Sequence, residues 1–457
     1  MRKKVMARIV SSVLVTALAA TMLTGCRFGF ASDPDDPNEE EKKVPIDTST
    51  DTFTYDASLN GTNITLLNTK AEIQAALEEM GAEYEKKSGV HVDVMPVSDD
   101  SPYTKMISLY NSGNPPTVAI LDTTDVVALA EEKAADLSGE KWVSEAEGYT
   151  TELNGKIYSF PLCIEGRGII YNKAVIEKVL GEEFDPASVT TLDEFRALLD
   201  QLVDKGMEKP VSMAKEDWSL GAHHLQYIYE TYDGTSEGAQ KAVEEIKAGR
   251  LNLNSYKRMS EFLDIFDVLR EYNVAKGDPL GADYDEMAID LADGKTAFWF
   301  NGNWAWPNLS EAGAEETDEY GFLPYFMNND KSDFANQMIQ GAPSKQVMVD
   351  RQIATPKEQA AGKQFLSWMV YSEIGQQMLV KTCNIIPPFK NNPYEPADPL
   401  SRDLYEKVHA QKAFSASVIV PNDHWAVLGA AMQKYLAGRS DRDELMESIQ
   451  DYWNEQE

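Results

Sequence analysis

The order of apolar and polar residues predicts strands that alternate with helices. Residues 63–68 (NITLLN) form a short apolar run between turn formers, which is typical of a buried strand. Apolar residues then recur at helical spacing over 73–84, and Ser88-Gly89 ends that helix. This succession continues, and it predicts a parallel sheet with helices on its faces. The next expected elements are a strand over 90–97, a helix over 103–113 and a strand over 116–122.

The alternation resumes in the second part of the chain, where Thr191 is the expected N-cap of a helix. No internal repeat is visible, and two α/β stretches within 457 residues predict two lobes. The expected strands cover 166–173, 209–214, 294–300, 320–326 and 340–349, and the expected helices cover 190–206, 262–269, 360–371 and 424–438.

Polar residues follow several of the predicted strands. Ligands of parallel α/β sheets bind beyond the carboxyl ends of the strands. The residues at such positions are Asn68, Lys70 and Glu72 after the first strand, Asp122 after the third, and Glu216 and Trp218 after 209–214.

The first residues resemble a secretion signal. A positive stretch precedes an apolar run over 9–23 that is too short and too rich in small residues for a membrane span. The run ends in LTGC, which resembles the lipobox of bacterial lipoproteins, whose cysteine, here Cys26, becomes the lipidated N-terminus. The resemblance implies a signal peptide over 1–25 and a mature protein anchored outside the cytoplasmic membrane. An ordinary secreted protein with an incidental Cys26 is the alternative.

Residues 26–58 are expected to be a flexible acidic tether, because they contain few large apolar residues to bury. Such a tether favours the surface of a Gram-positive bacterium, and a periplasmic location stays open.

Charge and missing motifs narrow the classes of function. The net charge of −33, from 75 acidic and 42 basic residues, argues against a nucleic-acid partner. The chain has no GxSxG, HExxH or Walker motif, so we expect no enzyme, cofactor or metal. A glycosidase stays open, because it needs only two carboxylates. Cys163 and Cys383 make no disulfide framework, although a single bridge between them is allowed outside the cell.

Three segments resemble the maltose- and maltodextrin-binding proteins, which are extracytoplasmic sugar receptors of ABC importers. These segments are Gly294–Trp306 (GKTAFWFNGNWAW), Gly155–Lys173 (GKIYSFPLCIEGRGIIYNK) and Lys105–Asp122 (KMISLYNSGNPPTVAILD). Their order and spacing extend the resemblance over nearly the whole mature chain.

The resemblance implies an α/β fold of the two-lobed periplasmic-binding-protein type (type II), with a hinge and an interlobe cleft for the ligand. Both lobes are then discontinuous in sequence. The implied N-terminal lobe covers 59–165 and 336–384, and the implied C-terminal lobe covers 166–335 and 385–457. The implied crossings between the lobes lie near 165–168, 325–336 and 384–389.

Several residues match sugar-contacting positions of that family. Glu165 matches a crossing carboxylate that hydrogen-bonds sugar hydroxyls, and Trp304 matches a sugar-stacking tryptophan. Trp218 falls where the family has a stacking tyrosine, and Trp425 falls near another stacking tryptophan, after a shorter stretch. Asp122 falls at a polar contact. Weaker expectations of ligand contact attach to Asn68, Lys70, Glu72, Glu216 and Asn301.

Structural alternatives exist for these residues. In the alternative for Glu165, its carboxylate bonds to the backbone or to Arg167. Trp218 is then a loop anchor, and Asp122 is the N-cap of a helix. Trp299 alternates with its phenylalanine neighbours on a strand and is expected in the core, and Trp306 is expected to pack. Structural roles are also expected for Trp142 and Trp368. Surface or packing roles are expected for His223 and His224, with contact to the cleft as the alternative.

The predicted function is therefore that of a monomeric receptor, which binds a carbohydrate, in particular an oligosaccharide, and delivers it to an importer without catalysis. An indole covers the apolar face of a sugar, and a carboxylate accepts its hydroxyl hydrogens. The permease and ATPase must be separate proteins. A receptor for a non-sugar solute, a carboxylate-based glycan-processing enzyme and a surface adhesin are the alternatives.

Overall fold

The computed structural model describes residue 46 and residues 51–97, 101–146 and 148–456. Cys26 and the predicted signal peptide therefore lie outside the described residues. Within the described ranges, no helix combines the length and the apolar character that crossing a membrane requires.

Nine strands of the described residues form one continuous mixed sheet. Its order is β2-β1-β3-β10-β6-β8-β7, with β11 beside β10 and β9 beside β6. Strand β1 is parallel to both β2 and β3, which confirms the predicted parallel start. The strands are β1 (Asn63–Asn68), β2 (His91–Pro96), β3 (Val118–Asp122), β6 (Phe160–Asn172), β7 (Val211–Ser212), β8 (Phe298–Gly302), β9 (Tyr320–Leu323), β10 (Ile339–Val349) and β11 (Ala413–Phe414), and the separate hairpin β4 (Glu152–Leu153) and β5 (Lys156–Ile157).

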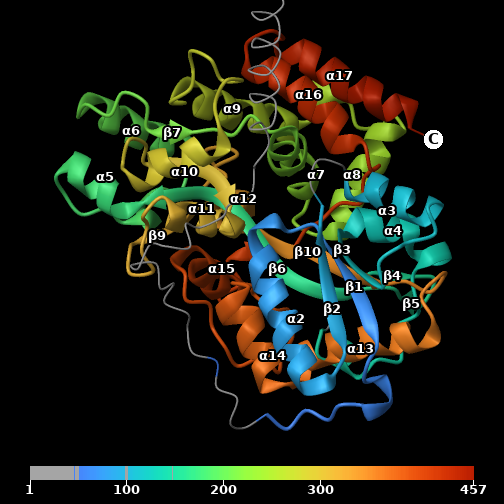
Figure 1. The fold of residues 1–457 in the computed structure, drawn as a ribbon. Helices are drawn as coiled ribbons and strands as arrows, with labels where there is room; N and C mark the ends of the chain where they lie inside the picture. Colours follow the sequence, from blue (N-terminus) through green and yellow to red (C-terminus); the bar gives the residue numbers. More distant parts are fainter. Residues whose placement is uncertain (1–45, 47–50, 98–100, 147, 457) are drawn as a thin grey trace, which may run out of the picture. The chain divides into compact units, whose positions relative to one another are not determined.

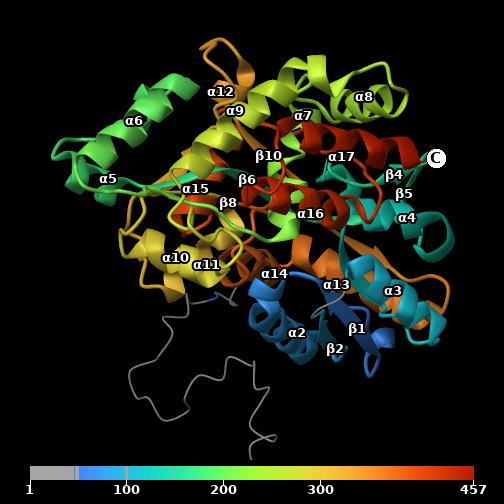
Figure 2. The same cartoon turned by 90° about the horizontal axis from the view of Figure 1, so that it is seen from above.

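The first lobe packs helices on both faces of β1, β2 and β3. Ile64 and Leu66 on β1 join the core under α2 and α13, whereas Leu67 points to the opposite face under α3 and α4. Helix α13, far along the chain, lies beside the N-terminal strands (Figures 1 and 2). The helices of this lobe are α2 (Gln74–Ser88), α3 (Pro102–Asn111), α4 (Thr123–Lys133), α13 (Pro356–Tyr371) and α14 (Glu373–Gln377).

The second lobe is built around β8 and its neighbours. Phe298 and Phe300 point into one core and Trp299, between them, points into the other, so the predicted core position of Trp299 is confirmed. Trp306 also packs in a core, as expected. The helices of this lobe are α5 (Lys173–Leu180), α6 (Leu192–Asp204), α7 (Tyr227–Glu230), α8 (Ser236–Lys247), α9 (Lys257–Glu271), α10 (Tyr284–Ala292), α11 (Trp306–Glu311), α12 (Phe334–Gln337), α15 (Pro399–His409), α16 (His424–Leu436) and α17 (Arg442–Glu455).

Strands β6 and β10 belong to both lobes. Along β6, Phe160 and Leu162 join the first core, and Ile169 joins the second. The antiparallel register of β6 and β10 shifts between Pro343 and Gln346 and leaves Ser344 without an opposite residue. This irregularity is a β-bulge, which bends a strand and raises its local twist.

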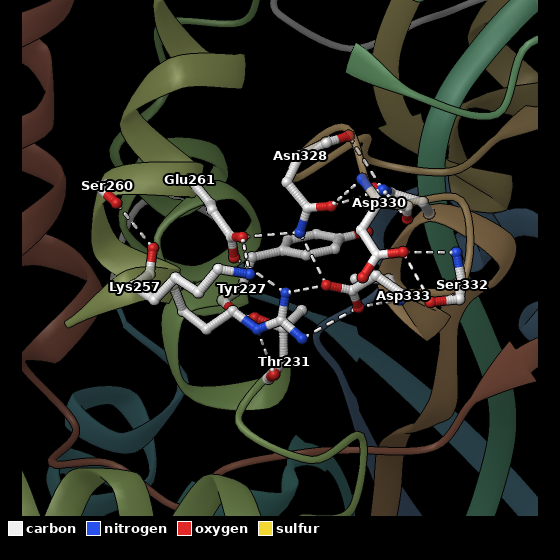
Figure 3. Close-up of polar contacts among 12 residues, drawn as sticks. Tyr227, Thr231, Lys257, Ser260, Glu261, Asn328, Asp330, Ser332 and Asp333 are labelled. Atoms are coloured by element: carbon white, nitrogen blue, oxygen red, sulfur yellow. Dashed lines mark hydrogen bonds and ion pairs between the residues drawn. The ribbon is translucent and has the colours of Figure 1, made fainter.

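The segment near the expected middle crossing is attached to the second lobe. Tyr325 and Ala335 are buried in the second lobe, and β10, which follows, contacts both lobes. Arg258 on α9 binds Asp333 through two hydrogen bonds of 2.6 and 3.0 Å. Figure 3 shows Glu261, Asn328 and Asp333 pointing toward one another in the same network.

The end of the predicted tether is attached to the first lobe. Phe53 and Tyr55 pack against its core, and the Tyr55 ring lies 6.1 Å from that of Tyr84. The Asp56 backbone N–H also donates to Gln364 Oε1 at 2.6 Å. The folded part thus begins before residue 59, because two aromatic side chains find a surface to cover.

Candidate ligand-binding site

Lys70 follows β1 in a loop that Asn68 closes on itself. The Lys70 backbone N–H donates to Asn68 Oδ1 at 2.9 Å, and the Asn68 amide donates to the Lys70 carbonyl at 2.8 Å. The same amide donates to Gln74 Oε1 at 2.9 Å. Asn68 is only 1% exposed, so the structure gives it the role of holding the loop that positions Lys70.

Lys70 and Glu165 form a buried ion pair at the centre of the site. Lys70 Nζ is hydrogen-bonded to Glu165 Oε1 and lies 2.5 Å from Glu72 Oε1. Burial alone would raise the pKa of Glu165, but the charge and hydrogen bond of Lys70 and the hydrogen bond of Ser344 lower this pKa below its ordinary value. Glu165 is therefore an ionised acceptor.

The second oxygen of Glu165 accepts a hydrogen bond from the Ser344 hydroxyl, at the bulge of β10. Arg167, the partner considered as an alternative, instead places Nη2 2.5 Å from Glu230 Oε2 in the second lobe. The Glu165 side chain is thus oriented by Lys70 of the first lobe and by Ser344 on β10, a strand that both lobes share.

A narrow cavity lies against this ion pair, and the space that it leaves for a water-sized molecule is only about 20 Å³. The lobes would therefore have to move apart to admit a sugar. Four predicted site residues line the cavity: Lys70, Glu72, Glu165 and Trp304. The other lining residues are Ile73, Cys163, Ile164, Asn303, Pro307, Cys383, Asn384 and Ile385.

Trp304 reaches the cavity from the second lobe, in the 3-10 turn Asn303–Ala305 after β8. Its ring folds back over Gly302, where an added Cβ would lie 2.1 Å from a ring atom, so the turn requires glycine. Asn303 fixes the turn by accepting the Gly166 N–H at 3.1 Å and donating to Ser401 Oγ at 3.2 Å. The indole is therefore held in place and stays partly exposed.

Trp304 belongs to a row of four aromatic rings. Its ring centroid lies 4.6 Å from His223, which lies 5.2 Å from Trp218, which lies 5.7 Å from Tyr284. Asn301 donates to the Tyr284 hydroxyl at 2.9 Å. Because Asn301 is only 3% exposed, it supports this row from behind.

The row is fixed by the π-helix Ser219–His224, which packs against α16 at two glycines. A Cβ at Gly221 would lie 2.4 Å from the Trp425 carbonyl oxygen, and one at Gly429 would lie 2.4 Å from the Asp217 carbonyl oxygen. π-Helices are rare and often occur at functional sites. Trp425 is partly exposed in the first turn of α16, outside the cavity lining, so its ligand contact stays a prediction.

Glu216 lies just before the π-helix. Its Oε2 atom is buried and has no hydrogen-bond partner among the described residues. Burial raises the pKa of this carboxyl above its ordinary value. A buried acceptor without a partner is a candidate for a ligand contact, as the sequence suggested.

Two acidic residues lie at the start of α4. Asp122 occupies the N-cap position, but its side chain makes no capping hydrogen bond and binds Lys345 Nζ at 2.6 Å. Asp125 accepts a 2.6 Å hydrogen bond from Asn422, which precedes α16. This second bond links the two lobes directly.

Replacing Asp125 with asparagine is expected to change how stability depends on pH. Burial, and then the charge of Asp122, raise the pKa of Asp125 from 3.8 to about 7. Because the folded pKa is raised, the free energy of unfolding falls as pH rises from about 4 through 7. Asp125→Asn should remove a fall on the order of 2–4 kcal/mol while keeping the acceptor for Asn422. Urea unfolding from pH 4 to 8 measures the difference, and parallel curves for the two proteins would contradict the expectation.

Other features do not add to the site. Cys163 and Cys383 both line the cavity as free, buried thiols, so the bridge considered from the sequence is not formed in this structure. No cluster of three or more potential metal ligands occurs among the residues described. A wider hollow lies between Val179 and Lys295, and no aromatic side chain or predicted site residue lines it.

Sequence reasoning missed several residues of the site. Tyr284 was not considered, and it extends the aromatic row that includes His223. Ser344 and Lys345 bind two of the predicted carboxylates. Both lie on a strand that the pattern identified, but the carboxylates that they bind, Glu165 and Asp122, are far away along the chain. The expected structural roles of Trp142 and Trp368 are confirmed, because both are fully buried.

Comparison with known proteins identifies the class. The family model of the bacterial extracellular solute-binding proteins matches residues 79–402, more than half of the chain. The chain therefore belongs to that family, whose members are binding proteins with an extracytoplasmic location.

Individual relatives share the fold. The multiple sugar-binding protein of Streptococcus mutans is 27% identical over 306 residues, which span 65% of this chain and 65% of that protein. RafE in complex with raffinose superimposes with a TM-score of 0.70 at 21% identity, covering 86% of this chain and 99% of that one. A chitin oligosaccharide binding protein superimposes with a TM-score of 0.64 at 21% identity over 86% and 98% of the two chains. The chain has the two-lobed α/β fold of these proteins.

Proposed function

We propose that this protein captures a carbohydrate, in particular an oligosaccharide, in the cavity between its lobes and delivers it to an ABC importer. The observation that carries the proposal is the ionised Glu165 and the indole of Trp304 lining one cavity from different lobes. The carboxylate suits sugar hydroxyls, and the indole suits the C–H face of a sugar ring. Lys70, Glu72, Asp122, Trp218, Glu216 and Trp425 extend the proposed contact surface.

The relatives support a sugar rather than another solute. Their names specify multiple sugars, raffinose and chitin oligosaccharide as the ligands of those proteins. The cavity is lined by a tryptophan and an ion pair, which fits a neutral polyhydroxylated ligand better than a strongly charged one.

The site favours binding without catalysis. A glycosidase needs a carboxylic acid that is protonated at neutral pH and donates to the leaving group. Glu165 has a lowered pKa because Lys70 lies beside it, so Glu165 is unsuited to that role. Burial raises the pKa of Glu216, so the same reasoning does not apply to that carboxyl. Because the members of the matching family are binding proteins, we propose a receptor rather than an enzyme.

The same proposal includes the setting of the receptor. A lipid on Cys26 would anchor it outside the cell membrane, with a Gram-positive surface favoured by the acidic segment that follows. It would act as a monomer and pass its ligand to separate permease and ATPase proteins. Two discontinuous lobes, joined through β6, β10 and the segment near 384–389, would close around the sugar.

Titration with a glycan panel tests the proposal. The mature chain from residue 27 should bind raffinose, maltotriose, diacetylchitobiose or xylotriose, with a dissociation constant near 1 μM for the best of them. Binding to the native state must raise the melting temperature, and the sugar should be recovered unaltered. A chemically altered sugar would show an enzyme, and a panel without any response would favour a non-sugar solute or an adhesin.

A further inference from the structure

His223 carries a buried ring nitrogen for which the fold provides no partner. Its Nδ1 atom is inaccessible and makes no hydrogen bond to any of the residues described. Its neighbour His224 also has a buried ring nitrogen without a partner, Nε2, but its Nδ1 lies 2.9 Å from the Tyr325 hydroxyl and its ring packs 4.0 Å from Phe300 in the core. An unpartnered polar atom in a buried position costs stability, so it calls for an explanation.

The position of the His223 ring suggests what kind of partner its Nδ1 atom takes. His223 lies between Trp218 and Trp304, and Trp304 lines the ligand cavity. The unpartnered Oε2 atom of Glu216 belongs to the same short segment. Neither His223 nor Glu216 is among the residues that line the cavity in this conformation. His223 nevertheless places an unsatisfied polar atom between two indoles, which suits a sugar, because its hydroxyls bond polar atoms and its C–H faces cover rings.

The backbone of His223 is fixed from behind. Arg167 on β6 donates from Nε to the His223 carbonyl at 3.0 Å, and its Nη2 atom is paired with Glu230. Burial, and then the nearby charge of Arg167, lower the pKa of His223 well below its ordinary value. The imidazole is therefore neutral, with one nitrogen that donates and one that accepts.

We propose that His223 is a specificity-determining residue, which hydrogen-bonds through its imidazole to a ring hydroxyl of the sugar stacked on Trp304. This inference rests on the proposed function. A site built to bond a hydroxyl discriminates strongly against ligands that lack it, whereas stacking alone discriminates weakly. His223 would thus select among glycans that Trp304 accepts.

Three variants of the mature chain test the inference. His223→Phe keeps a ring between the indoles but removes both nitrogens, and His223→Asn restores a polar atom near the position of Nδ1. His224→Phe is the matched control, because it removes the bond to Tyr325 from the adjacent residue. Each variant is titrated with raffinose, maltotriose, diacetylchitobiose and xylotriose, and its melting temperature is measured without sugar.

We expect His223→Phe to weaken binding of the best glycan about 10- to 100-fold, with an unchanged or higher melting temperature. His223→Asn should regain part of that affinity. His224→Phe should lower the melting temperature by about 5 °C and keep the affinity.

Wild-type binding that His223→Phe leaves intact would overturn this inference alone. A melting temperature lowered in His223→Phe as far as in His224→Phe would also overturn it, by showing a structural role. If the wild-type protein bound none of the glycans, the proposed function would be wrong, and this inference, which rests on it, would be wrong too.

Discussion

Replacing Lys70 with methionine is expected to lower the free energy of unfolding by about 3–5 kcal/mol at pH 7. Only 10% of the Glu165 side chain is exposed, and Lys70 is the cation that is hydrogen-bonded to it. Without that cation a carboxylate remains buried and uncompensated, which is far more costly than the loss of a surface ion pair. The same change should abolish measurable sugar binding, because Glu165 would no longer be held ionised in one orientation.

The pH dependence of this loss gives a second check. Because the folded pKa of Glu165 is lowered, the pair stabilises the protein above the ordinary pKa of 4.5 and ceases to do so as pH falls below it. The difference between wild type and Lys70→Met, measured by urea unfolding, should therefore shrink toward pH 3. The double variant Lys70→Met/Glu165→Gln should recover part of the stability.

Lys345→Met is the matched control for this experiment. Lys345 also lies near the cavity, but half of its partner side chain, Asp122, is exposed to solvent (50%). Its loss should cost less than about 1 kcal/mol. Equal effects of the two lysine substitutions would contradict the central role assigned to the Lys70–Glu165 pair.

Trp304→Ala is expected to weaken binding of the best glycan at least about 30-fold, which corresponds to about 2 kcal/mol. The indole is the one aromatic ring among the residues that line the cavity, and Gly302 beneath it has no side chain to take its place. Trp304→Phe should retain an intermediate affinity. Isothermal titration calorimetry on the mature chain measures all three proteins.

Trp306→Ala provides the contrast two residues further along. Trp306 is 5% exposed and packs in a core cluster of the second lobe. Its truncation should lower the free energy of unfolding by about 3–5 kcal/mol and leave the affinity of the folded protein unchanged. If Trp304→Ala destabilised the protein without weakening binding, the two tryptophans would have been assigned the wrong way round.

Much of the fold follows from local patterns in the sequence. The run 63–68 is β1, Gly89 ends α2 with a positive φ of 68°, and Thr191 caps α6 as expected. Period-two alternation also separates Trp299 from its two phenylalanine neighbours on β8. These features depend on neighbours within a few residues, so a single sequence contains them.

The attachment of the segment near the expected middle crossing could not be predicted, because composition does not show where a polar segment is attached. Arg258, from an earlier helix, binds Asp333 and fixes residues 328–333 (NNDKSD) in the second lobe. The attachment depends on a contact between residues 75 apart. No local pattern encodes such a contact.

The site was predicted as separate residues and not as an arrangement. Lys70 and Glu165 were both identified, but their pairing across 95 residues was not. For His223 the sequence favoured a surface or packing role and left contact with the cleft as an alternative. Its position depends on a π-helix and on the contact between Gly221 and Gly429, which only the fold brings together.

The bulge at Ser344 connects occupancy of the ligand site to the conformation of β10, the strand that both lobes share. Ser344 is the residue without an opposite partner where β10 bends, and its hydroxyl also holds Glu165. A sugar hydroxyl that competes for this oxygen would release Ser344 at the bend of a strand shared by both lobes. Ligand binding would then act directly on the strand that joins the two lobes, with no relay of intervening residues.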